Sequence, residues 1–132
     1  MKNQTLLKTF LFISAIIAIA IGASLLFFPV EFEASAGITI DTSASALSEV
    51  RSSGGLLLAC GVLIFIGIFK KSMLKFSLII SALLYLAYGF SRILSIVLDG
   101  VPHGSILAAA VLEIIIGLIS LFALKKIETK KN

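Results

Sequence analysis

The sequence is poor in cysteine, histidine and charged residues. The single cysteine, Cys60, excludes an internal disulfide. The single histidine, His103, leaves no close His or Cys pair of the kind that binds zinc. Nucleophile motifs, phosphate-binding loops and nucleotide fingerprints are also missing. We therefore expect no metal site and no catalytic residues, and the sequence identifies no cofactor.

Hydrophobic residues make up 59% of the chain and charged residues 14%. Soluble domains contain roughly 45–50% apolar residues, so this composition is that of a membrane protein. The net charge of +4 could indicate a nucleic-acid partner. However, the lysines flank apolar stretches, so we expect membrane lipid as a partner and no nucleic acid.

Four apolar stretches are long enough to cross a bilayer, which takes about 20 residues of helix. We predict an all-α integral membrane bundle that forms a single domain over residues 1–132. Its four transmembrane helices run up-down-up-down at about residues 6–28, 47–69, 73–98 and 105–125. The first could instead be a secretory signal, since residues 34–36 resemble a cleavage site. Its apolar run exceeds the usual ~7–15 residues, so we favour a permanent helix.

The longest connection, residues 29–46, is the outer loop. Its apolar residues alternate briefly around Gly37, which indicates a small hairpin or an interfacial flap over the bundle. Orientation follows from the lysines, which concentrate in cytoplasmic segments. They lie at both termini and between the second and third spans: Lys2, Lys8, Lys70, Lys71, Lys75, Lys125, Lys126, Lys130 and Lys131. We therefore expect both termini to be cytoplasmic.

The third span carries a polar stripe. Residues at spacings of three and four share one helical face: Ser77, Ser81, Tyr85, Tyr88, Arg92, Ser95 and Asp99. Arg92 lies about 10 Å along the helix from Asp99, and Glu113 lies about 10 Å into the fourth span. These residues are on consecutive antiparallel helices at matched depth, so we expect an ion pair.

Glu49 and Arg51 lie at the outer start of the second span, which predicts one cluster of four charges in the outer half of the bundle. An arginine at mid-helix costs roughly 2.5–3.5 kcal/mol on insertion scales, which favours pairing. Intramembrane charges usually mark a site, although this cluster could instead be a staple that fixes helix register. We predict these ligand-binding residues: Glu49, Arg51, Tyr85, Tyr88, Arg92, Ser95, Asp99 and Glu113.

These features indicate a small multipass protein that acts without catalysis. It would be an accessory subunit or a module that binds a small ligand or lipid, as a homo-oligomer or within a larger membrane complex. One alternative is a transporter-like bundle for a small anionic ligand, because buried arginines suit carboxylates and phosphates. Another is a membrane enzyme acting on a lipid or quinone-like substrate, with Glu49 and Glu113 as acid and base.

Several motifs run in a characteristic order: Glu49-x-Arg51-x-x-Gly54-Gly55, Arg92-x-x-Ser95, Asp99-Gly100-x-Pro102 and Glu113. Through most of its length the chain resembles the bacterial domain-of-unknown-function family 4345, whose members are small four-helix membrane proteins. Ser53 replaces the family's usual aromatic residue, and Gly89-Phe90-Ser91-Arg92 replaces a Gly-Arg pair. The resemblance implies a membrane bundle without an assigned activity, located in the bacterial cytoplasmic (inner) membrane. A looser similarity to DoxX-like membrane proteins implies a redox-associated or accessory role.

Overall fold

The computed structural model describes residues 2–129, which are helical almost throughout. Its elements are α1 (Lys2–Phe27), α2 (Pro29–Ser35), α3 (Ala44–Phe69), the short 3-10 helix η1 (Lys71–Met73), α4 (Leu74–Asp99) and α5 (Gly104–Thr129). Among the described residues there is no strand. The predicted all-α class is therefore confirmed.

Each of the long helices α1, α3, α4 and α5 has 26 residues. At 1.5 Å per residue such a helix is about 39 Å long, more than the roughly 30 Å of a bilayer's hydrocarbon core. All four are long and apolar enough to cross a membrane. Large apolar side chains such as Leu56, Leu83 and Phe122 remain exposed on them, as lipid-facing surfaces require. The protein is a membrane protein with four candidate spans.

Small residues bring α1 and α3 into close contact. A Cβ atom added at Gly54 would lie 2.7 Å from the backbone nitrogen of Leu26, and one at Gly61 would lie 2.8 Å from the backbone nitrogen of Ile19. On α1, Gly22 faces the backbone of Leu58. Glycine lets the two backbones approach, which is how membrane helices associate closely.

A second helix pair forms between α4 and α5 by the same means. A Cβ atom at Gly89 would lie 2.5 Å from the side chain of Ile114, and one at Gly117 would lie 2.6 Å from the side chain of Leu86. The large side chain of each helix therefore fills the notch left by a glycine on the other. This contact fixes the register of α4 against α5.

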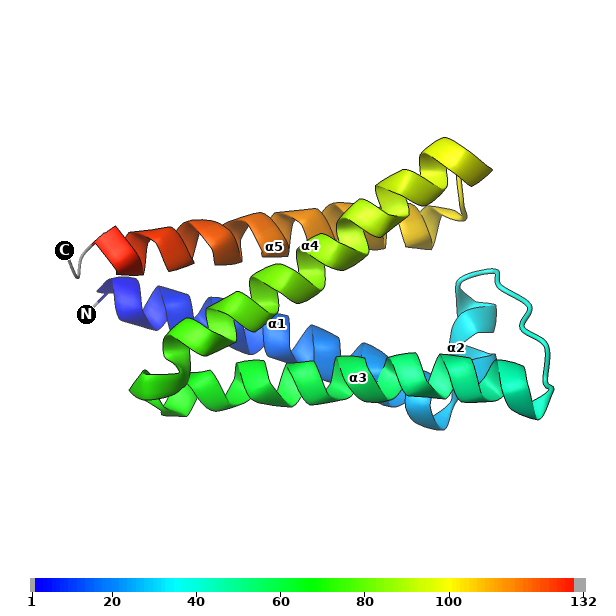
Figure 1. Cartoon of the computed structure of the whole chain (residues 1–132), viewed down its shortest axis with the longest axis horizontal. Coiled ribbons are helices and arrows are strands. Elements are labelled where there is room, and N and C mark those ends of the chain that lie inside the picture. Colours follow the sequence, from blue (N-terminus) through cyan, green and yellow to red (C-terminus); the bar gives the residue numbers. More distant parts are fainter. Residues whose placement is uncertain (1, 130–132) are drawn as a thin grey trace.

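The two helix pairs diverge along the bundle (Figure 1). They are closest at the end that carries η1, the start of α1 and the end of α5, which we call the terminal end. There Lys75 Nζ and Glu128 Oε1 form an ion pair at 2.6 Å. At the opposite end, the loop end, α4 tilts away from α3.

The segment 29–46 differs from the predicted alternation, because it begins with the helix α2. Pro29 stands in the first turn of α2, where its fixed φ suits helix initiation and its missing N–H costs nothing. Gly37 then reverses the chain with a φ of +74°. The Ser43 hydroxyl caps α3 by accepting a hydrogen bond from the Ala46 amide at 3.3 Å. The hairpin expectation was wrong.

Candidate functional site

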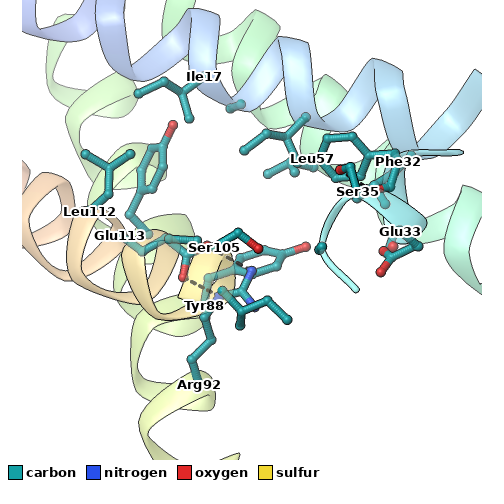
Figure 2. A pocket seen from close by; sticks show the side chains of 18 of the residues that line it. Ile17, Phe32, Glu33, Ser35, Leu57, Tyr88, Arg92, Ser105, Leu112 and Glu113 are labelled. Atoms are coloured by element: carbon teal, nitrogen blue, oxygen red, sulfur yellow. Dashed lines mark hydrogen bonds and ion pairs between the residues drawn. The ribbon is translucent and has the colours of Figure 1, made fainter. Parts of the chain in front are cut away.

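A cavity of about 360 Å³ lies between the two helix pairs toward the loop end. Its wall is mainly apolar and is built from α1, α3, α4 and α5, whose contributions include Ile17, Ile21, Leu25, Leu57, Leu84 and Leu112. The helix α2 and the residues after it close part of the opening (Figure 2). Where α4 diverges from α3, a partly open and mainly apolar pocket lies between the helix pairs.

The pocket wall holds the predicted ion pair between Arg92 and Glu113 (Figure 2). Arg92 Nε donates to Glu113 Oε2 at 2.8 Å and Arg92 Nη2 donates to Glu113 Oε1 at 3.2 Å, which is a bidentate arrangement. The glutamate side chain is 11% exposed and the arginine side chain 31%. The guanidinium also lies 6.0 Å from the centre of the Tyr88 ring, within range of a cation–π contact.

Both tyrosines of the sequence line this pocket. Tyr85 is buried, and its hydroxyl donates a hydrogen bond to the backbone carbonyl of Ser14 on α1. Tyr88 is half-buried one turn nearer the loop end, beside Arg92. Tyr85 therefore ties α4 to α1, and Tyr88 lies beside the ion pair between α4 and α5.

Three buried serines, which do not line the pocket, join three helices on its terminal side. The Ser81 hydroxyl lies 2.8 Å from the Ser14 hydroxyl and 2.8 Å from the Ser120 hydroxyl, and all three residues are fully buried. These hydrogen bonds connect α1, α4 and α5 where the two helix pairs meet. Ser14 was not among the predicted site residues, although it is the one hydroxyl residue between Phe10 and Ala23.

The structure does not bring the four predicted charges together. Glu49 is exposed, and neither Glu49 nor Arg51 lines the pocket. Arg51 instead donates a hydrogen bond to the carbonyl of Leu26. Because α1 ends at Phe27 and Pro29 starts a new helix, the last carbonyls of α1 need outside donors, and a cation there also complements the helix dipole. Arg51 caps α1.

Ser95 and Asp99 also lie apart from the pocket. The Ser95 hydroxyl donates to Asp99 Oδ2 at 3.1 Å, and both residues are exposed. They share a helical face with Arg92, but α4 tilts away from the bundle as it approaches the loop end. Half of the predicted site residues line the pocket, namely Tyr85, Tyr88, Arg92 and Glu113.

The pocket also contains polar residues that were not predicted. They are Glu33 and Ser35 on α2, Ser53 on α3 and Ser105 on α5. The expectation of a flap over the bundle was the one signal that pointed to the first two. Within residues 2–129 no group of three or more His, Cys, Asp or Glu side chains is placed to hold a metal ion. The pocket thus combines an apolar wall with an ion pair, tyrosines and a few serines.

Comparison with known proteins gives one family match. No curated protein and no solved structure matches the chain significantly. The model of the family described as "Domain of unknown function (DUF4345)" matches residues 6–124, and this range contains every residue of the pocket. The chain therefore belongs to the DUF4345 family.

Proposed function

We propose that this protein is a non-enzymatic membrane module that binds a small amphiphilic molecule in the pocket between its two helix pairs. The observation that carries the proposal is the cavity of about 360 Å³ with an apolar wall and a small polar region at one side. Ligand sites are typically clefts of about 300–1,000 Å³ with mainly apolar linings and a few placed polar groups. A close-packed bundle with the same ion pair would have no such space.

In this proposal the protein lies in the bacterial inner membrane. The amphiphile enters the pocket from the surrounding bilayer. The lysines Lys8, Lys71 and Lys126 lie at the terminal end, and acidic residues such as Glu31 and Asp41 lie at the loop end. By the positive-inside rule, the loop end and the pocket opening then face outward. Arg92 lies seven residues from Asp99, or about 10 Å along α4, which supports a position for the ion pair inside the bilayer.

The polar groups of the pocket favour binding over catalysis or transport. Arg92 and Glu113 are bonded to each other, and Tyr85 is bonded to α1. On the terminal side of the pocket, the hydrogen-bonded serines Ser14 and Ser81 are fully buried. The mutual engagement of Arg92 and Glu113 supports a binding module, alone or as the ligand-binding subunit of a larger membrane complex.

Tyrosine fluorescence tests the proposal at the site itself. The sequence has two tyrosines and no tryptophan, and both tyrosines line the pocket. We expect at least one of three short amphiphiles, hexylammonium, hexanol and hexanoate, to change this emission saturably in phosphatidylcholine nanodiscs. Ala109→Phe should abolish the response, because residue 109 lines the pocket. Ala108→Phe, at the exposed neighbouring position, is the matched control.

Two outcomes contradict the proposal. One is an emission that does not saturate with any of the three probes. The other is an Ala109→Phe protein that responds as strongly as the Ala108→Phe protein.

A further inference from the structure

The charged residues that line the pocket carry a negative formal balance. They are the carboxylates of Glu33 and Glu113 and the guanidinium of Arg92. Arg51, which the sequence offered as a second cation, caps α1 elsewhere. An anionic ligand would therefore meet two acids and one base. Two buried arginines would have favoured an anionic ligand, but this arrangement of charges does not.

The single arginine is already neutralised. Both of its hydrogen bonds go to the two carboxylate oxygens of Glu113, and its guanidinium lies over Tyr88. An anion could use Arg92 fully only by displacing Glu113, which would leave a carboxylate unpaired in an apolar wall. Breaking a buried pair in this way is strongly unfavourable, because it leaves an uncompensated charge.

Glu33 is the charge in the pocket that lacks a counterion. Its carboxylate lies across the cavity from the Arg92–Glu113 pair (Figure 2). The ion pairs found within residues 2–129 join Lys75 to Glu128 and Arg92 to Glu113, and neither involves Glu33. The nearby loop residue His103 bonds to Ser105 through its Nδ1 atom. Glu33 is half-buried.

We propose that the ligand of this pocket is a small cationic amphiphile, such as a primary alkylamine. Its ammonium group binds Glu33 and its apolar body lies along Ile21 and Leu57. This inference rests on the proposed function and specifies the ligand's charge. The ring of Phe32, adjacent to Glu33 and also in the lining, offers a π face to the same cation. The hydroxyl of Ser35, which donates to the Phe32 carbonyl at 2.6 Å, leaves its lone pairs free to accept from the ammonium.

The experiment compares hexylammonium, hexanol and hexanoate by tyrosine fluorescence in phosphatidylcholine nanodiscs, with the same six-carbon chain in each probe. We expect the wild type to bind hexylammonium about tenfold more tightly than hexanol, since one charge-assisted hydrogen bond contributes about 1.5 kcal/mol or more. Hexanoate should bind most weakly. Glu33→Gln should weaken hexylammonium binding about tenfold and leave hexanol binding unchanged, which also shows that the pocket is intact.

The chain offers a matched control on the same short helix. Glu31 is exposed and does not line the pocket, so Glu31→Gln removes an equal charge and should bind all three probes like the wild type. Glu33→Lys should reverse the preference toward hexanoate. Equal weakening of hexylammonium binding in both glutamine variants would assign the effect to general surface charge and overturn the proposal.

A wild type that prefers hexanoate or hexanol would also overturn the inference, while leaving the proposed binding function intact. If no probe gives a saturable response, the proposed function itself fails. Glu33→Gln could lose binding of hexanol and hexylammonium alike, while Glu33→Lys gains no binding of hexanoate. In that case α2 shapes the pocket without selecting ligands by charge, and the inference is also wrong.

Discussion

Replacing Glu113 with glutamine removes the carboxylate that accepts two hydrogen bonds from Arg92 and nearly preserves the size of the side chain. Removing one partner of a buried pair costs about 3–5 kcal/mol, because the remaining charge has no partner. Arg92 is 31% exposed, so part of its charge is solvated in the variant, and glutamine still accepts one hydrogen bond. We therefore expect a loss of about 2 kcal/mol in the free energy of unfolding.

The assay is unfolding in mixed micelles with increasing sodium dodecyl sulfate, followed by circular dichroism. A double-mutant cycle with Arg92→Gln isolates the pair, and the cost of the double variant should fall short of the sum of the single costs by about 1–2 kcal/mol. Asp99→Asn is the control, because this exposed acid on α4 should change stability by less than about 0.5 kcal/mol. Additive single costs would refute the claim that the ion pair stabilises the α4–α5 contact.

Three further predictions concern the contacts that shape the pocket. Gly54→Ala should destabilise the protein by about 1–3 kcal/mol because its Cβ meets the backbone of α1, whereas Gly55→Ala, with nothing within 4 Å, should be neutral or stabilising; the same unfolding assay measures both. Ser81→Ala loses two buried hydroxyl partners and should cost about 1–2 kcal/mol, against no measurable change for the exposed Ser91→Ala. Arg51→Met should fray the end of α1, which amide hydrogen exchange detects as faster exchange confined to the turn before Pro29; unchanged exchange there would contradict the capping role.

The sequence was sufficient to predict the Arg92–Glu113 pair. Helical periodicity assigned Arg92 to the polar face of α4, and the short turn at Asp99 set the depth of Glu113 on the next antiparallel helix. Both inferences use only the helical repeat and rise, which hold for any regular helix. Local helix geometry was therefore enough to predict a contact between two residues on consecutive helices.

The composition of the pocket could not be predicted in the same way, since it depends on how α4 diverges from α3. Each pair is closely packed at glycines such as Gly54 and Gly89, and a helical repeat does not reveal these contacts. Arg51 faces the end of α1 because Pro29 interrupts that helix there. Glu33 lines the pocket because it lies on the helix α2, whereas the alternation around Gly37 had suggested a small hairpin or an interfacial flap.

The most direct test of a ligand-binding pocket is native mass spectrometry of the protein gently solubilised from the membranes in which it is naturally made. We predict that the wild type and Ala108→Phe retain a small amphiphile and that Ala109→Phe, which fills the pocket, does not. The same spectra report the number of subunits. Identical small-molecule adducts on all three proteins, or none on any of them, would contradict the account.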